Sequence, residues 1–380
     1  MEFLVAAGTL LWVAVILVPW HPWSTRERLE AGNEPDEPDL SDVTVLIPAR
    51  NEAPAIERTL IALRRQGRGL RVVLVDDQSS DGTAAVARLA WPAGLTIIRG
   101  QPLPGGWTGK LWALEQGWSA VGSELVLLLD ADIELEPRTA GALKRKLIFE
   151  KLALVSVMAQ LRMDSLWEKM LVPAFVYFFK LLYPFAVGNN PQSRLGVAAG
   201  GCILVRSNSL KMIGAFHSLR NALIDDCSLA ESVKKSGGRT WIGLSHSVRS
   251  QRAYVRLSSF WEMVERTAFT QLRYSIWLLL ATTFLMVLAF WFPWAGILSP
   301  RVDVRFIALG GICAMTLSFV PTLRYYQRSI LWAALLPIIS SLYLLMTWSS
   351  ALRYWRGKRS QWKGRIYART PFPQQNARRR

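Results

Sequence analysis

The sequence predicts an α/β protein in which a mixed, mostly parallel sheet with flanking helices is joined to transmembrane helices. Between residues 43 and 158, short apolar runs rich in β-branched residues alternate with stretches of helical spacing, a pattern typical of a sheet covered by helices. Elsewhere the chain contains long uncharged apolar runs. Hydrophobic residues make up 51% of the 380 residues, which is a high share for a protein without membrane spans.

The predicted strands and helices follow one another in order along the chain. Strands are predicted at residues 43–48, 71–76, 95–98, 124–130 and 152–158, and helices at residues 53–66, 81–90 and 111–120. The second of these helices is predicted to begin at Asp81, because an aspartate side chain can cap the first turn. Ligands of such sheets bind outside the carboxyl ends of the strands, so we expect the functional residues at that edge.

Four apolar runs are each about long enough to cross the ~30 Å hydrocarbon core of a bilayer at ~1.5 Å per residue. They cover residues 3–20, 275–298, 306–323 and 329–352. Buried helices of a soluble core are the alternative, but such helices rarely stay apolar on every face. The first run starts with Glu2 and no basic residue, and no small-residue cleavage site follows it. We therefore interpret it as a retained anchor rather than a signal peptide.

These features predict five parts of the chain. They are an N-terminal transmembrane anchor (1–23), an acidic linker (24–42), a cytoplasmic α/β domain (43–274), three C-terminal hydrophobic segments (275–352) and a basic tail (353–380). Within the domain, residues 166–187 are aromatic and apolar but include Glu168 and Lys180. The motifs on both sides of this segment are expected to build one site, so it is predicted to lie in the membrane interface as a helix or hairpin without crossing.

The charge of the chain favours a membrane surface as a partner. The net charge is +17, and ten of the 45 basic residues lie in the tail at 353–380. A basic segment beside a span fits anionic head groups and retention on the cytoplasmic side, so the protein is predicted to be integral to a bacterial inner membrane. A nucleic-acid partner is not expected, because zinc-ligand spacing and a single-stranded-RNA motif are missing. The three cysteines form no disulfide framework.

The predicted membrane segments leave one conflict open. One anchor, a cytoplasmic domain and three later spans would put the basic tail outside, whereas basic segments favour the inside. Two alternatives remain. One apolar run is re-entrant, for which 275–298 is a candidate because it contains Pro293 and Gly296, or the tail is an exception to the rule.

Acidic pairs occur where two predicted strands end. Asp76 and Asp77 follow one strand, where a carboxylate can accept hydrogen bonds from a nucleotide base or ribose; turn and capping chemistry is the alternative. Asp130 and Asp132 follow another strand and are separated by one residue, so both carboxylates can face one ligand. Such hard oxygen ligands suit Mg²⁺ or Mn²⁺, which can bridge diphosphate oxygens; capping of the next helix is the alternative.

A third acidic pair, Asp225 and Asp226, opens a predicted helical stretch. Near a metal–diphosphate site, one of two adjacent carboxylates can act as a general base whose pKa its neighbour tunes; favourable charge at a helix N-terminus is the alternative. Gly200 and Gly201 let the backbone approach a ligand closely, unless they only form a tight turn into a strand. Lys110 could place a cation near phosphates, although a lone lysine is usually solvated.

Several other chemistries lose support because their motifs are missing. The sequence has no GxxxxGK[ST] loop, no GxGxxG after a strand, no GxSxG and no HExxH. Kinase-type phosphoryl transfer, dinucleotide redox chemistry and serine hydrolysis are therefore not expected.

Taken in order, six motifs resemble those of the family-two glycosyltransferases with a GT-A fold. They are PARNE (48–52), VDDQSSDGT (75–83), GKLWAL (109–114), LLLDAD (127–132), AGGCILVR (199–206) and IDDCSLA (224–230). The resemblance covers residues 43–275. The N-terminal anchor, the C-terminal spans and a WKGRIY stretch (362–367) make the chain most similar to hopanoid-biosynthesis-associated glycosyltransferases, which are relatives of ceramide glucosyltransferases.

The resemblance implies a role for each matching residue. Asp77 would hold the nucleotide base, Asp130 would contact the nucleotide, Asp132 would coordinate the divalent metal, and Asp226 would be the catalytic base. Gly200 and Gly201 would line the acceptor site, and the remaining substrate-binding positions would be Pro48, Arg50, Glu52, Lys110, Asp225 and Arg273. Two departures stand out: the family's Glu-Asp pair is Asp225-Asp226 here, and its QxxRW motif has only the approximate counterpart 270–274, which contains Arg273.

The predicted function is a metal-dependent, inverting transfer of a sugar from a nucleotide-diphosphate sugar to a membrane lipid. The resemblance makes a hopanoid- or ceramide-like lipid the expected acceptor and Mg²⁺ or Mn²⁺ the expected cofactor. Two alternatives stay open, a processive polysaccharide synthase and a non-catalytic membrane scaffold that retains the fold. Three C-terminal spans are few for a polysaccharide pore, and the complete set of aspartates disfavours a scaffold.

Overall fold

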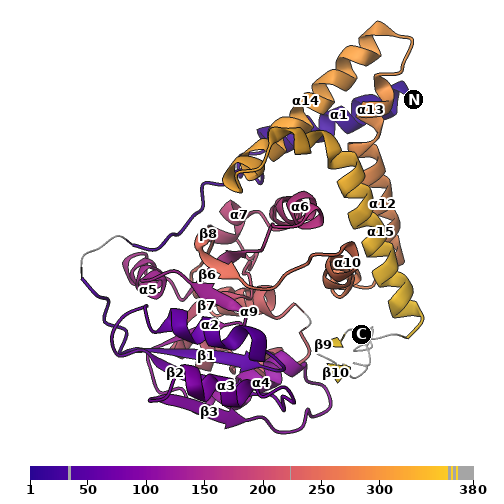
Figure 1. The fold of residues 1–380 in the computed structure, drawn as a ribbon. Helices are drawn as coiled ribbons and strands as arrows, with labels where there is room; N and C mark the ends of the chain where they lie inside the picture. Colours follow the sequence, from indigo (N-terminus) through magenta and orange to yellow (C-terminus); the bar gives the residue numbers. More distant parts are fainter. Residues whose placement is uncertain (33–35, 223, 358–360, 363–364, 367–380) are drawn as a thin grey trace, which may run out of the picture.

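The computed structural model describes residues 1–32, 36–222, 224–357, 361–362 and 365–366. It confirms the predicted fold class, a mixed and mostly parallel sheet with flanking helices (Figure 1). The sheet has eight strands in the order β3-β2-β1-β4-β7-β6-β8-β5. Most of the predicted basic tail and part of the WKGRIY stretch lie outside the described residues.

Four neighbouring strands of the sheet are parallel. They are β1 (Val43–Ala49), β2 (Arg71–Asp76), β3 (Leu95–Arg99) and β4 (Leu125–Leu129). Beyond them, β7 (Cys202–Arg206) runs antiparallel between β4 and β6 (Leu154–Gln160), β8 (Thr240–Ser250) is parallel to β6, and β5 (Ile133–Leu135) closes the edge antiparallel to β8. Because β7 is reversed, it begins at the edge where β4 ends.

Helices cover both faces of the sheet, which explains why β1 and β4 are buried along their whole length. Every residue of β1 is buried, yet its side chains alternate between two cores. Val45 and Ile47 join the core on the α2 side (Ala53–Leu63), and Leu46 joins the core beneath α4 (Gly109–Trp118). A strand buried on two faces shows no polar alternation in its sequence. The other helices of the domain include α3 (Thr83–Ala90), α5 (Thr139–Phe149) and α9 (Asp225–Lys235).

The predicted boundaries lie within three residues of the observed ones. Helix α3 was predicted to begin at Asp81 but begins at Thr83, with Gly82 as its N-cap. Asp81, just before the cap, accepts a hydrogen bond at Oδ1 from the Thr83 amide at 3.0 Å. Strands β5, β7 and β8 were not delimited from the sequence, since β5 is very short and β7 and β8 carry no acidic exit motif.

The segment predicted as a solvated acidic linker at 24–42 in fact packs on the domain. The backbone amides of His246 and Ser247 in β8 donate hydrogen bonds of 2.9 and 3.0 Å to Glu30 Oε2. Leu40 is completely buried. Glu30 of this stretch therefore binds backbone amides of β8, a contact that the net charge of the stretch does not predict.

The predicted interfacial segment forms a single long helix, α6 (Leu166–Leu182), followed by the short α7 (Phe185–Asn189). The hairpin alternative is wrong, because the helix runs through Pro173 without reversing. A capping box starts it: Ser165 accepts from the Glu168 amide, and Glu168 accepts from the Ser165 amide. Figure 1 shows α6 and α10 (Leu257–Glu265) between the sheet and the long apolar helices. The membrane-interface position of α6 stays a prediction.

Three segments are long and apolar enough to cross a membrane, judged by length and composition. They are Ile276–Gly296 (α12 and α13), Val302–Tyr325 (α14) and Ile330–Trp355 (η2 and α15). The N-terminal helix α1 (Glu2–Leu17) is apolar but shorter. It packs beside these helices, since Thr9 Oγ1 donates to Ile307 O at 3.0 Å and Trp12 Nε1 donates to Ala289 O at 2.6 Å. Helix α1 therefore belongs to the same helical bundle as α12 and α14.

The end of α14 contacts the sheet, and α15 contacts the helices α6 and α10 next to it. The Tyr325 ring stacks on His246 of β8 with centroids 4.1 Å apart. Further along, Tyr343 of α15 donates to a carbonyl of α6, and Arg353 near the end of α15 pairs with Glu265 of α10 at 2.5 Å. Figure 1 shows α15 running back past α6 and α10, beside α12.

Candidate active site

The sheet order brings the ends of the motif-bearing strands together. Strands β2, β1 and β4 are neighbours, so the residues that follow them share one edge of the sheet. The reversed β7 starts at this edge, because Leu129 is paired with Cys202. The Asp130 amide donates to Gly201 O at 3.0 Å, which joins the aspartate loop to the glycine loop. This edge is the one that the sequence predicted.

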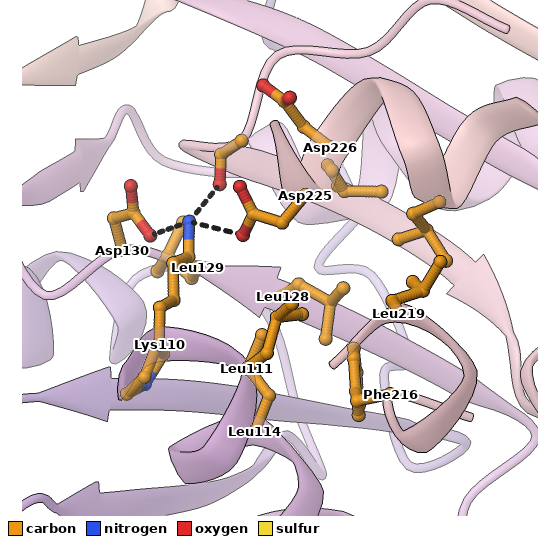
Figure 2. Close-up of a pocket in the computed structure, with 14 residues that line it drawn as sticks. Lys110, Leu111, Leu114, Leu128, Leu129, Asp130, Phe216, Leu219, Asp225 and Asp226 are labelled. Atoms are coloured by element: carbon orange, nitrogen blue, oxygen red, sulfur yellow. Dashed lines mark hydrogen bonds and ion pairs between the residues drawn. The ribbon is translucent and has the colours of Figure 1, made fainter. Parts of the chain in front are cut away.

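Lys110, in the first turn of α4, connects three of these loops (Figure 2). Its ammonium Nζ lies 2.7 Å from Asp130 Oδ1, 3.7 Å from Asp225 Oδ2 and 3.3 Å from Gly200 O. Burial alone would lower the pKa of Lys110, but the charges of Asp130 and Asp225 raise it above its ordinary value. The lysine is therefore a fixed cation of the site rather than a solvated surface group. Beneath it a largely apolar pocket includes Pro48.

Asp226 occupies a different environment from its neighbour Asp225, although both begin α9. Figure 2 shows the carboxylate of Asp225 turned toward Lys110 and that of Asp226 turned away. Burial raises the pKa of Asp226 to about 7, and the negative charge of Asp225 adds to the effect. Gly200 makes this packing possible, because a Cβ there would lie 3.4 Å from Asp226 Oδ2 and 3.3 Å from Lys110 Nζ.

Asp132 lies next to a basic residue that sequence reasoning missed. Its Oδ2 accepts from Ser250 Oγ at 3.2 Å and lies 3.3 Å from Arg252 Nε. The same guanidinium reaches Glu52, with 3.1 Å between Arg252 Nη2 and Glu52 Oε1. Arg252 follows β8, a strand that was not delimited from the sequence, so no motif pointed to it.

The acids suit a divalent cation held together with a diphosphate. Asp132 Oδ1 makes no hydrogen bond within the described part of the chain, so a hard oxygen ligand is available at this carboxylate. Among the described residues, no group of three or more His, Cys, Asp or Glu side chains could hold a metal by itself. Mg²⁺ is commonly bound in this way, through one or two carboxylates completed by substrate phosphates.

Arg50 and Asp77 form the third part of the site, at the ends of β1 and β2. Arg50 Nη1 donates to Asp77 O at 2.5 Å, and the Asp77 amide donates to Ala49 O at 2.7 Å. The Asp77 side chain is buried. Gly100 closes over it, since a Cβ on this glycine would lie 3.0 Å from the Asp77 Cα. The two loops are thus locked together at the edge next to β4.

Arg273 lies apart from these acids. It follows α11 (Ala268–Gln271), is exposed, and forms no ion pair within the described ranges. No ion pair among the described residues therefore supports the expectation that Arg273 reaches a diphosphate. Arg273 and Tyr274 both have positive φ angles, 51° and 57°, which is uncommon for residues with a side chain.

Two further polar side chains that the sequence did not single out lie close to Asp226. Tyr183, just after α6, donates to Gln271 Oε1 of α11 at 2.5 Å. Burial raises the pKa of Tyr183 to about 12, and nearby Cys227 and Asp226 contribute. The helices next to the apolar bundle thus supply polar groups on the Asp226 side of the site.

Comparisons with known proteins agree with this geometry. Residues 44–214 match the family model "Glycosyl transferase family 2". A 4,4'-diaponeurosporenoate glycosyltransferase of Staphylococcus haemolyticus is 33% identical over 93 residues, which are 24% of this chain and 24% of that protein. An undecaprenyl-phosphate 4-deoxy-4-formamido-L-arabinose transferase of Salmonella paratyphi B is 31% identical over 138 residues, 35% of this chain and 42% of that protein.

A solved structure is similar over almost the whole chain. The mannosyltransferase PcManGT from Pyrobaculum calidifontis, solved in complex with GDP-Man and Mn²⁺, has a TM-score of 0.54 and 18% identity and covers 93% of this chain and 100% of that one. At this identity the likeness shows the fold alone, which is GT-A-like. The chain spans less than half the length of the curated relatives that it matches. Residues 44–214 are therefore similar to a glycosyltransferase family 2 domain.

Proposed function

We propose that the protein transfers a sugar, with inversion, from a nucleoside-diphosphate sugar to a hydroxyl group of a membrane lipid. The observation that carries this proposal is the convergence of Lys110, Asp130, Gly200, Asp225 and Asp226 at the carboxyl end of β4. A cation, a glycine loop and a pair of adjacent acids are groups that a displacement at an anomeric carbon can use.

The donor would lie across the ends of β2, β1 and β4. Asp77, locked to the Arg50 loop, would hold the base, and Asp130 with Lys110 would contact the nucleotide and sugar. Asp132 would hold Mg²⁺ or Mn²⁺. Such an ion offsets charge on the departing diphosphate when it is bound. Pro48 and Glu52 border this region, as the resemblance implied.

Asp226 would act as the general base toward the acceptor hydroxyl. Asp225 is engaged by Lys110, whereas Asp226 has a pKa of about 7, raised by burial and by Asp225. A general base works best when its pKa lies near the operating pH. The two adjacent aspartates would thus divide their roles, with Asp225 holding the lysine and Asp226 accepting the proton.

A lipid acceptor is supported by the elements that surround Asp226. Tyr183 and Gln271 belong to the segments that join the domain to the apolar helices. A relative is named for undecaprenyl phosphate, which is itself a lipid. We place the acceptor in the hopanoid- or ceramide-like class, because the chain resembles those enzymes and because such lipids offer a hydroxyl nucleophile that needs a base.

The arrangement of the helices supports a catalytic domain on the cytoplasmic side. Helices α1 and α14 would cross the membrane, and α15 would lie beside α12, next to α6 and α10. Arg301, before α14, pairs with Glu2 at 2.8 Å, which puts charged residues at the end of the bundle away from the domain. The end of α14, at Tyr325, and the end of α15, at Arg353, both lie near the domain, so the basic tail would begin on the cytoplasmic side.

The test measures sugar transfer to a lipid by the full-length protein in lipid nanodiscs. Purified protein is incubated with UDP- and GDP-sugars, Mn²⁺ and a hopanoid or ceramide acceptor, and products are identified by mass spectrometry. We expect a glycosylated lipid from one donor, and none from the Asp226→Asn variant. Donor hydrolysis without lipid transfer would overturn the acceptor assignment. Absence of nucleotide-sugar binding for every donor would support the scaffold alternative.

A further inference from the structure

Arg252 places a guanidinium group inside the donor side of the site. Its side chain is 35% exposed, whereas the side chains of its partners Asp132 and Glu52 are only 13% and 12% exposed. It leaves the end of β8, where the Gln251 amide donates to Asp132 O at 2.8 Å. This backbone hydrogen bond fixes the Arg252 loop to the aspartate loop, so the guanidinium is held within reach of whatever binds Asp132.

The guanidinium group of Arg252 contacts two different carboxylates, so it can keep one of them while it exchanges the other for a new anion. Nε faces Asp132 at 3.3 Å and Nη2 faces Glu52 at 3.1 Å. A planar guanidinium with several donors can keep one carboxylate while it releases another. Burial acts to lower the pKa of Arg252, but Asp132 raises it on balance, so the charge persists.

Resting on the proposed function, we infer that Arg252 is a donor-diphosphate-binding residue that exchanges Asp132 for the diphosphate when the nucleotide sugar binds. In the free protein the guanidinium neutralises Asp132 and occupies its Oδ2. When the donor arrives, Glu52 retains the arginine, the guanidinium turns to the diphosphate oxygens, and Oδ2 of Asp132 is released, so both carboxylate oxygens can face a metal ion. Guanidinium groups bind phosphate oxygens through paired charge-assisted hydrogen bonds.

This assignment supplies the leaving-group contact for which the sequence offered only Arg273. Arg273 is exposed and forms no ion pair within the described residues, whereas Arg252 already touches the aspartate expected to hold the metal. A cation beside the departing diphosphate stabilises charge that grows in the transition state.

The experiment measures binding and turnover of the full chain in nanodiscs for the wild type, Arg252→Ala and Arg252→Lys. Arg249→Ala is the matched control: Arg249 lies near the end of β8, before Arg252, is 58% exposed and pairs with Glu136. Mn²⁺ binding without nucleotide is followed by electron paramagnetic resonance. Binding of UDP and GDP with Mn²⁺ is followed by calorimetry, and turnover is measured with the active donor.

We expect two effects of opposite sign for Arg252→Ala. Mn²⁺ alone binds at least about fivefold more tightly because a competing cation is gone, whereas the nucleoside diphosphate binds more weakly and kcat falls by roughly 10²-fold or more. Arg252→Lys keeps the positive charge but not the planar guanidinium group with its several donors. Its affinities and kcat should therefore lie between those of the wild type and those of Arg252→Ala. Arg249→Ala matches the wild type in every measurement.

The outcomes separate this inference from the proposed function. If the wild type binds neither Mn²⁺ nor any nucleotide, the proposed function fails. If the wild type binds and turns over but Arg252→Ala behaves like Arg249→Ala, only the role of Arg252 is overturned. A uniform loss of Mn²⁺ and nucleotide binding in Arg252→Ala, with Arg252→Lys unaffected, would assign Arg252 a structural role and also overturn the exchange.

Discussion

Lys110 lies 3.7 Å from the carboxylate of Asp225, and the carboxylate of the next residue, Asp226, turns away from it (Figure 2). One ammonium group therefore distinguishes two adjacent acids that the sequence alone leaves equivalent. Asp225 has a cation beside it, and Asp226 has burial and a negative neighbour. This asymmetry underlies the first two predictions.

Replacement of Asp226 by asparagine should remove turnover while donor binding persists. Loss of general-base catalysis costs ~10²–10⁴-fold in rate, and the amide keeps the shape of the carboxylate. In the wild type, kcat/KM should rise with pH through about 7, because the base works only when deprotonated and its pKa is about 7. Steady-state kinetics from pH 5.5 to about 8.5, with calorimetric donor titrations, would check both points. A variant with wild-type kcat would exclude Asp226 as the base.

The same variant should be more stable than the wild type at alkaline pH. The pKa of Asp226 is raised on folding from an ordinary value of 3.8 to about 7, so the folded chain binds this proton more tightly than the unfolded chain. That stabilisation is complete below the ordinary pKa and is lost as the pH rises to about 7. Asparagine cannot ionise, so the gain in melting temperature should be largest at about pH 8 and shrink toward about pH 5.

Thermal unfolding at several pH values measures this difference. Glu134→Gln is a suitable control, because Glu134 is exposed on β5. Its melting temperature should differ from that of the wild type by a similar amount at each pH. An Asp226→Asn variant that is less stable at alkaline pH would show that the charged carboxylate is favourable in the folded protein.

Metal activation should depend on Asp132 more strongly than on Ser250. Loss of an outer-sphere partner of a metal ligand typically costs ~10–100-fold in metal affinity, and Ser250→Ala removes the hydroxyl that bonds Asp132 at 3.2 Å. Asp132→Ala removes the ligand itself and should cost more. The Mn²⁺ concentration for half-maximal activity would rank the variants, and full activity in a chelator would contradict the metal assignment.

Gly200 should be sensitive to an added side chain, for reasons of contact rather than of backbone angle. A Cβ there would sit 3.3 Å from Lys110 Nζ and 3.4 Å from Asp226 Oδ2, whereas a Cβ at Gly122 meets nothing within 4 Å. We expect Gly200→Ala to lower kcat between about tenfold and 10²-fold, since small displacements of reacting groups are costly. Gly122→Ala should leave kcat unchanged. Equal kcat values for both variants would show that the glycine loop is not part of the reacting geometry.

Much of the domain could be predicted because its signals are local. Strands buried on both faces read as continuous apolar runs, and parallel strands send their carboxyl ends to one edge, so the places of Asp77, Asp130 and Asp132 followed from the pattern. The neighbourhood of Gly200 and Asp130 also depends on the reversal of β7, which places Cys202 opposite Leu129. No local pattern in the sequence encodes that pairing.

The parts that escaped prediction depend on contacts between distant segments. Arg252 lies beside Asp132 only because β8 ends there, and Glu30 is bound by β8 amides that are far away in the sequence. Likewise, the apolar character of residues 329–352 fits a membrane span and a helix along the domain equally well. The contacts that position this helix, with Tyr343 on α6, Arg353 on Glu265 and Trp348 on α12, all join segments distant in the sequence.

The last prediction concerns the side of the membrane on which the tail begins. Re-entry of one apolar run, with 275–298 as the candidate, was one of two alternatives. The contacts place the ends of both α14 and α15 near the domain, since Tyr325 stacks on His246 and Arg353 pairs with Glu265. In sealed inside-out vesicles, a C-terminal tag should therefore be digested together with the domain. Leu298, which is 85% exposed before α14, marks the opposite side. As a cysteine in a Cys313→Ala background, it should react with an impermeant maleimide only in right-side-out preparations. A protected tag would mean that α15 crosses the membrane, and the positive-inside tendency would then be broken at the tail.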